Sequence, residues 1–230
     1  MKQRSPRDPT VLEPAQVALH QVVSFAPDFD GRVDTLTRSS LFRVQRVHDG
    51  VVAEWVRYSL ERDPSAFPLG RISVHPRALL LETFSEARMN LLESVASESG
   101  IGRVRADQLR VFRVADAVAN PRNLVQPLHE PADEDLTARE VAVAYLRMAW
   151  PFLVREDLGG RNPESVLRTG RGRAALEAIV EELPRELRAE MPSFPAFSVD
   201  ELFELLLAEQ PAPIETSVRR PRSAAPRRKD

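Results

Sequence analysis

Short runs rich in β-branched and aromatic residues dominate the first half of the chain. Two such runs within residues 41–60 meet at Asp49 and Gly50, a pair that tolerates the positive φ angles of a tight turn. This pattern predicts a β-hairpin. Residues 69–74 and 78–83 form a second pair of runs, and residues 109–114 form a further one. The first half is therefore predicted to contain a small, mainly antiparallel sheet.

Helical spacing appears once in this half. After residue 83, residues that would share one helix face recur every three or four positions. This pattern predicts one helix that ends near Gly100. These residues are Phe84, Arg88, Leu91, Leu92 and Val95. Residues 120–134 then place three prolines among acidic residues, which indicates a linker.

Three helix starts are predicted beyond the linker. Thr137 and Ser198 each precede a glutamate by three positions, the spacing of a capping box. Asn162 stands before Pro163, which combines a capping side chain with a proline in the first turn. Apolar stripes at helical spacing follow these starts, so the second half is predicted to be entirely helical.

The predicted fold class is α+β, with an N-terminal antiparallel β-rich unit that includes one helix, followed by a C-terminal bundle of short helices. We expect the β-rich unit at residues 13–119, the linker at 120–134 and the helical unit at 135–209. Residues 1–12 and 210–230 have few large apolar side chains to offset the entropy of ordering. Both ends are therefore predicted to be disordered.

The most specific motif lies inside the helical unit, at residues 158–173. Gly159 and Gly160 predict a helix stop, because glycine adopts the left-handed conformation that releases the chain. A helix restarts three residues later. The residues expected to shape this turn are Leu158, Gly159, Gly160 and Pro163, with Leu167 facing the core, Thr169 capping the next helix and Gly172 allowing close approach.

Residues 150–183 resemble a known family. The pattern LGGRNP, followed by Leu167, Thr169, Gly172 and Arg173, is similar to the toxin-binding domain of Xre/MbcA/ParS-type antitoxins. It also resembles the helical module of bacterial SEC-C-motif proteins, in which a tryptophan precedes the LGG triplet by eight residues, as Trp150 does here. Residues 69–92 are similar to the strand–strand–helix segment that precedes this module.

The resemblance implies a protein-binding role, with a toxin as the partner in the nearest antitoxin relatives. It does not extend to zinc binding, because the chain lacks the cysteines of the SEC-C motif. Antitoxins of this kind place a helix-turn-helix before the toxin-binding domain, whereas the preceding residues here predict strands. The function expected is therefore that of a non-enzymatic bacterial interaction protein whose helical unit binds a protein partner.

Arg161 and Arg173 are the charged residues of the motif, and we predict that both are exposed and contact the partner. Trp150 is a third candidate, since tryptophan is frequent at binding hot spots. Its place just after an apolar helical stripe favours core packing instead. The glycines are expected to act only by setting the turn.

Composition narrows the chemistry further. The chain has 230 residues and no cysteine, which excludes a disulfide scaffold, a thiol nucleophile and a thiolate zinc site. The four histidines, at positions 20, 48, 75 and 129, are predicted in or near turns and loops and lack metal-ligand spacing. No G-x-S-x-G elbow or phosphate-binding loop is present. We therefore expect no catalytic residue, no metal and no cofactor.

No leader peptide or membrane span is predicted, because no apolar segment is long enough for either. Together with the missing cysteines, this favours a cytoplasmic protein that does not enter a membrane.

The net charge of −2 conceals a strong separation along the chain. Residues 1–216 carry −7, whereas residues 217–230 carry +5. The cations of this tail are Arg219, Arg220, Arg222, Arg227, Arg228 and Lys229. The alternative function is therefore association with nucleic acid through the tail. A solubilising tail, or one that associates with the chain's own acidic body, is the simpler interpretation.

Overall fold

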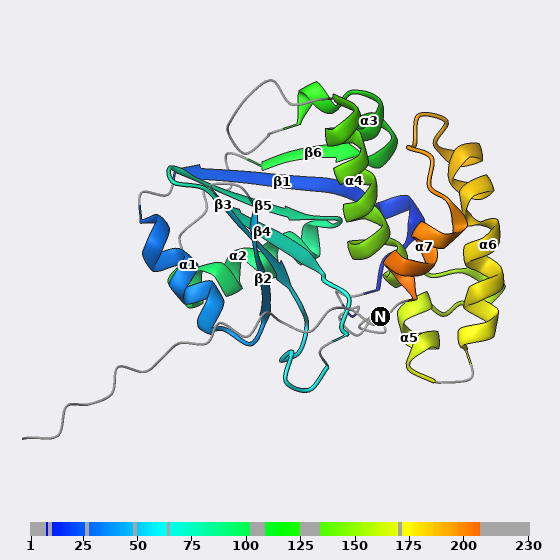
Figure 1. The fold of residues 1–230 in the computed structure, drawn as a ribbon, viewed down its shortest axis with the longest axis horizontal. Helices are drawn as coiled ribbons and strands as arrows, with labels where there is room; N and C mark the ends of the chain where they lie inside the picture. The colour runs from blue at the N-terminus through cyan, green and yellow to red at the C-terminus, as the bar shows by residue number, and fades with distance from the viewer. Residues whose placement is uncertain are drawn as a thin grey trace, which may run out of the picture.

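A computed structural model describes residues 8, 11–25, 28–47, 50–63, 65–101, 109–124, 134–169 and 172–207. Its centre is a six-stranded sheet in the order β2-β3-β4-β5-β1-β6, in which every neighbouring pair is antiparallel (Figure 1). The strands are β1 (Ala18–Phe25), β2 (Phe42–Val47), β3 (Gly50–Trp55), β4 (Gly70–Val74), β5 (Ala78–Thr83) and β6 (Leu109–Arg113).

Helices surround this sheet and form a layer beside it. They are α1 (Phe29–Arg38), α2 (Glu86–Glu98), α3 (Val114–Ala119), α4 (Glu134–Met148), α5 (Pro163–Leu167), α6 (Arg173–Glu190) and α7 (Val199–Leu206). Short 3₁₀ segments are η1 (Pro14–Gln16), η3 (Pro121–Asn123), η4 (Trp150–Phe152) and η5 (Glu156–Leu158). The α+β class is confirmed. The helices of the second half are not all short, since α4 and α6 have 15 and 18 residues.

The prediction of a single helix in the β-rich unit is wrong, because α1, α2 and α3 all lie within residues 13–119. Phe29, Val33 and Leu36 recur at helical spacing in α1, but they are the only large apolar residues of this helix. An aspartate cap starts it, with the Asp28 side chain accepting a hydrogen bond from the Gly31 N–H at 3.1 Å. Strand β1 was also not predicted, although it lies inside the sheet between β5 and β6.

The sheet is covered on both faces. The register places Gly70 and Thr83 side by side, and a Cβ at Gly70 would lie 3.2 Å from Leu92 of α2, so α2 covers that face. Side chains alternate along a strand, so Glu54 lies on the opposite face from Trp55, the partner of Gly70. Arg147 of α4 bonds to Glu54 at 2.7 Å, so α4 covers that second face (Figure 1).

A row of polar side chains crosses the sheet beneath α4. Arg43 pairs with Glu54 at 3.0 Å, and Gln21 donates to Glu82 at 2.9 Å. Arg71 pairs with the same Glu82. Because these residues stand opposite one another in the register, each charge meets an opposite or neutral neighbour. The row fixes how the helical layer sits on the sheet through Arg147.

The two predicted units share one hydrophobic core. A continuous cluster of buried apolar side chains extends from Leu12 to Leu207 and includes both strand and helix residues. Phe84 of the β-rich half, for example, meets Tyr145 of α4 edge to face, with ring centroids 5.9 Å apart. Residues 120–124 of the predicted linker are placed as η3 and its neighbours, while residues 125–133 lie outside the described residues.

The predicted helix start at Thr137 is wrong. Helix α4 begins at Glu134, so Thr137 lies inside it and is buried. Glu134 and Asp135 fill the first turn, where acidic side chains interact favourably with the helix dipole. The other two starts are confirmed: Ser198 forms a capping box with Glu201, and the Asn162 side chain accepts from the Ser165 N–H at 2.8 Å.

The N-terminal end is partly ordered, which corrects the prediction of disorder for residues 1–12. Leu12 is only 3% exposed and lies in the core. Its backbone pairs with the segment after η4, through Leu12 N–H to Phe152 O at 2.9 Å and Val154 N–H to Leu12 O at 3.0 Å. Of the earlier residues, Asp8 and Val11 are described, and residues 1–7, 9 and 10 lie outside the described part.

Within the described ranges, none of the helices combines the length and the apolar character that a bilayer crossing requires.

His20 lies in β1 rather than in a loop, and its side chain is 7% exposed. Burial lowers its pKa, and the nearby Glu86 carboxylate opposes this by raising it. Because the folded state binds the proton less tightly than the unfolded state does, acidification favours unfolding. We expect the free energy of unfolding to fall as pH drops through about 6.5, the ordinary pKa of histidine.

Urea unfolding at pH 7.5 and 5.5 measures this loss, with His20→Gln as the comparison because it cannot titrate. The substitution is expected to reduce the difference between the two pH values. An unchanged difference would show that His20 is not responsible.

Candidate protein-binding surface

The Gly-Gly turn is a small closed loop, defined here as the glycine loop, residues 155–161. Gly159 and Gly160 adopt positive φ angles of 65° and 76°, as the sequence predicted. The loop is closed by two backbone bonds, Arg155 N–H to Arg161 O at 3.0 Å and Gly160 N–H to Arg155 O at 2.9 Å. The helical segment that ends at Gly159 is the single 3₁₀ turn η5, which lies within the glycine loop.

Arg155 ties the glycine loop to α6. Its guanidinium bonds to Asp157 at 2.7 Å and to Glu186 of α6 at 3.1 Å, and lies 6.0 Å from the centre of the Trp150 ring. The hydrogen bond from Arg155 lowers the pKa of Asp157, so this carboxylate stays ionised well below neutral pH. Because Arg155 is itself largely buried, these contacts hold the loop in one position.

Arg161 is exposed, as predicted, and is oriented by the same loop. Its Nε donates to the Leu158 carbonyl at 3.2 Å. Among the residues that the structure describes, no ion pair is formed by Arg161. An arginine whose side chain is already oriented and forms no described ion pair can bind a carboxylate from another molecule at little entropic cost.

Helix α5 separates the two predicted contact residues. Pro163 occupies its first turn, and Leu167 packs partly against the core, both as predicted. Arg161 precedes α5, whereas Arg173 is the first residue of α6 beyond it. Arg173 is exposed, with 59% of its side chain accessible, and pairs with Glu177 at 3.1 Å. The two arginines therefore flank α5.

Of the two motif residues between α5 and α6, Thr169 and Gly172, only Gly172 has its predicted role. Thr169 does not cap α6 as predicted, because its hydroxyl instead donates to the Val166 carbonyl at 2.7 Å. The N-cap is Gly172, which has no side chain that could accept a hydrogen bond from the first turn. A Cβ at Gly172 would lie 2.1 Å from Val166 Cγ1, so the predicted close approach is confirmed.

Trp150 is not available as a surface contact. It is 2% exposed and belongs to the core, which is the packing alternative that the sequence favoured. Its Nε1 has no hydrogen-bond partner among the described atoms. The candidate surface therefore retains Arg161 and Arg173, without the tryptophan.

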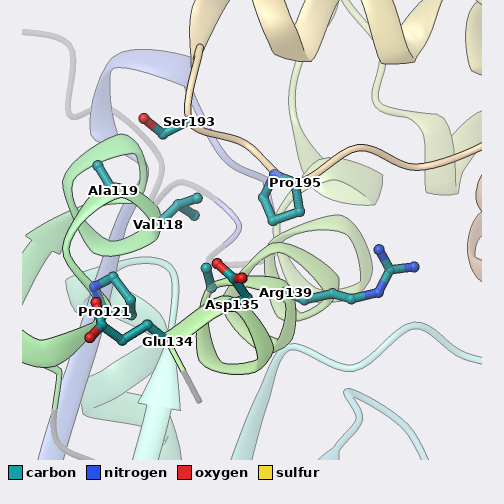
Figure 2. Close-up of a pocket in the computed structure, with 9 residues that line it drawn as sticks. Val118, Ala119, Pro121, Glu134, Asp135, Arg139, Ser193 and Pro195 are labelled. Atoms are coloured by element: carbon teal, nitrogen blue, oxygen red, sulfur yellow. The ribbon is translucent and has the colours of Figure 1, made fainter. Parts of the chain in front are cut away.

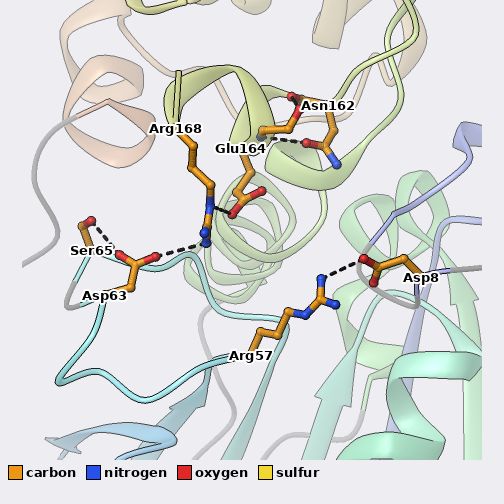
Figure 3. A network of polar contacts seen from close by, with 8 residues as sticks. Asp8, Arg57, Asp63, Ser65, Asn162, Glu164 and Arg168 are labelled. Atoms are coloured by element: carbon orange, nitrogen blue, oxygen red, sulfur yellow. Dashed lines mark hydrogen bonds and ion pairs between the residues drawn. The ribbon is translucent and has the colours of Figure 1, made fainter. Parts of the chain in front are cut away.

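A polar network beside α5 was not predicted. Figure 3 shows Arg168 at the end of α5 between Glu164 and Asp63, the latter at 3.1 Å on the loop between β3 and β4. Arg57 on that same loop pairs with Asp8 at 2.8 Å (Figure 3). Arg168 and Asp63 are 105 positions apart, and nothing local in the sequence signals their contact. Through Arg168 and Asp63, the network attaches the loop to the end of α5.

A cavity of about 390 Å³ opens between α3, α4 and the loop that precedes α7. Figure 2 shows Val118 and Pro195 on opposite sides of it, with the Asp135 carboxylate directed between them. Arg139 extends away from this space (Figure 2). The cavity belongs to a different part of the surface from the glycine loop.

The structure brings together no three acidic or histidine side chains that could hold a metal ion among its described residues. The six tail cations at positions 219, 220, 222, 227, 228 and 229 lie outside the described residues, so the nucleic-acid alternative stays a prediction. Searches against family models, curated proteins and solved structures found no match to this chain.

Gly159→Ala is expected to lower the free energy of unfolding by about 1 kcal/mol, since a Cβ disfavours the left-handed backbone. No atom lies within 4 Å of the added Cβ, so the cost comes from the backbone alone. Gly159→Asn should cost less, because asparagine tolerates this conformation. Urea unfolding of the three proteins measures the order, and an asparagine variant as unstable as the alanine one would contradict it.

Proposed function

We propose that this chain is a non-enzymatic interaction protein of the cytoplasm that binds a protein partner through the surface around α5. The observation that carries the proposal is Arg161, an exposed cation oriented by the glycine loop and not paired with any described carboxylate. Arginine is enriched among residues that dominate binding energy. Arg173 adds a second exposed cation at the other end of α5.

The chemistry of the surface favours a partner that presents carboxylates. Arginine forms two parallel hydrogen bonds with a carboxylate, which provides direction as well as charge. The resemblance of residues 150–183 to the toxin-binding domain of antitoxins supports a toxin-like protein as that partner. In this role Gly159, Gly160 and Gly172 shape the backbone and make no contact themselves.

Affinity capture with the tagged full chain tests the proposal. Arg161→Glu combined with Arg173→Glu is expected to reduce recovery of the partner by at least about tenfold, equivalent to roughly 1.4 kcal/mol. Neither side chain is buried, so the fold should persist, and circular dichroism checks this.

The matched control is Arg185→Glu combined with Arg188→Glu, which reverses two exposed charges nearer the C-terminal end of α6. It should capture the partner as well as the unaltered protein does. Equal recovery by all three proteins would reject the assignment of this surface.

A further inference from the structure

Tyr58 is an exposed aromatic side chain on the loop between β3 and β4. It is 45% exposed, and among the described residues it is the one aromatic side chain in the set of large apolar residues on the surface. Tyrosine is frequent among the residues that dominate binding energy, because its ring buries a large area while only two torsion angles become fixed. Tyr58 is therefore a candidate contact residue outside the LGGRNP motif.

The segment that carries this ring, residues 57–63, is held at both ends. Arg57 pairs with Asp8 at 2.8 Å, and Asp63 pairs with Arg168 at the end of α5 at 3.1 Å (Figure 3). These two ion pairs attach the loop to the N-terminal segment on one side and to α5 on the other.

The ring and the turn behind it are also fixed in position. The guanidinium of Arg57 lies over the ring of Tyr58, 5.0 Å from its centre. Leu60 is buried, and its backbone N–H donates to the Ser40 carbonyl at 2.8 Å. A side chain that is already ordered loses little conformational entropy on binding. Tyr58 can therefore serve as a rigid contact.

The same segment lies beside α5, which Arg161 precedes. Burial lowers the pKa of Arg57, but nearby carboxylates outweigh this effect and raise the pKa, among them Asp8 and Glu164 in the first turn of α5. Helix α5 has five residues and is about 8 Å long. A protein interface covers about 800 Å² of each partner, a patch roughly 30 Å across, and can include both Tyr58 and Arg161.

We propose that Tyr58 is an aromatic anchor of the partner-binding surface around α5, and that the partner accepts its ring in an apolar pocket next to the carboxylates that meet Arg161. Arg57 and Arg168 already pair with carboxylates of the chain, which favours the ring over these cations as the contact at this place. A buried tyrosine hydroxyl needs a hydrogen-bond partner, so the pocket also presents an acceptor. This assignment rests on the proposed function and adds the chemistry that the partner must present.

Photo-crosslinking from the loop tests the anchor in the full chain. A photoreactive phenylalanine derivative replaces the exposed Glu61, which leaves Tyr58 and both ion pairs of the loop in place. A second protein carries the derivative at the exposed Glu156 of the glycine loop, and a control protein carries it at the exposed Glu98 at the end of α2. After irradiation in cells, mass spectrometry is expected to find the same protein attached to positions 61 and 156 and not to position 98.

Tyr58→Ala is expected to lower the yield of both adducts by at least about tenfold, as expected for removal of a binding hot spot. Tyr58→Phe keeps the ring and should lower the yield by about fivefold at most, because it removes a single hydrogen bond. The matched control is Leu91→Ala, which removes a similarly exposed apolar side chain from α2 and should leave both yields unchanged.

An adduct at position 156 that Tyr58→Ala leaves undiminished would overturn the anchor and leave the proposed function in place. Different proteins attached to positions 61 and 156 would have the same consequence. No adduct from either position would reject the proposed function together with the anchor.

Discussion

Arg88→Ala is expected to lower the free energy of unfolding by about 3–5 kcal/mol, the range found when one partner of a buried polar contact is removed. Arg88 lies in α2, which covers one face of the sheet, and it has no exposed surface. It donates to the carbonyl of Met148 at the end of α4, and its guanidinium lies 4.5 Å from the Phe152 ring centre. The substitution would leave both a cavity and an unsatisfied carbonyl.

The charge of Arg88 contributes to this contact at neutral pH. Burial lowers its pKa to about 9, so the guanidinium is still protonated. A cation at the C-terminal end of α4 interacts favourably with the helix dipole. Arg88 therefore connects the sheet layer to the helical layer through both packing and charge.

Urea unfolding followed by tryptophan fluorescence measures the effect, with the exposed Asn90→Ala on the same helix as the control. The melting temperature should fall by about 10 °C for Arg88→Ala, at roughly 2–4 °C per kcal/mol for a chain of this size. A loss below about 1 kcal/mol would show that the protein tolerates the vacancy and that Arg88 does not join the two layers.

Leu12→Ala is expected to cost about 2–4 kcal/mol, because it removes a buried leucine from the core. Leu12 is 3% exposed and lies next to the segment that leads into the glycine loop, paired with Leu153 as an isolated bridge. The substitution should therefore destabilise the sheet and the helical layer together rather than one of them.

Val11→Ala is the matched control, since Val11 is adjacent in the sequence but 40% exposed. It should change the free energy of unfolding by less than about 0.5 kcal/mol. Fluorescence of Trp55 in the sheet and Trp150 in the helical layer can be followed separately in Trp55→Phe and Trp150→Phe backgrounds. If Leu12→Ala shifts only one of the two transitions, the halves do not form a single cooperative structure.

Local sequence signals predicted those parts of the fold that depend on local physics. The strands around Gly50, the Asn162 cap and the Ser198 capping box all follow from neighbouring residues. Strand β1 was missed, and its position in the sheet depends on partners about 60 and 90 residues away. The shared core was not predictable either, because an edge-to-face contact such as Phe84 with Tyr145 is created only by tertiary packing.

The candidate site shows the same division. Positive φ angles at Gly159 and Gly160, and exposure of Arg161, could be predicted from the LGGRNP pattern. The burial of Trp150 was favoured but not decided by its position. The pairing of Arg168 with Asp63, which attaches a distant loop beside α5, had no signal in the sequence.

Site-specific photo-crosslinking from the glycine loop tests the binding surface most directly. A photoreactive phenylalanine derivative replaces the exposed Glu156, which leaves Arg161 and its bond to Leu158 in place. A second protein carries it at the exposed Glu181 on α6. Irradiation of cells is expected to give one recurrent protein adduct from position 156, none from 181, and a large loss when Arg161→Glu is added. No adduct from position 156, or one that Arg161→Glu leaves undiminished, would contradict the proposed function.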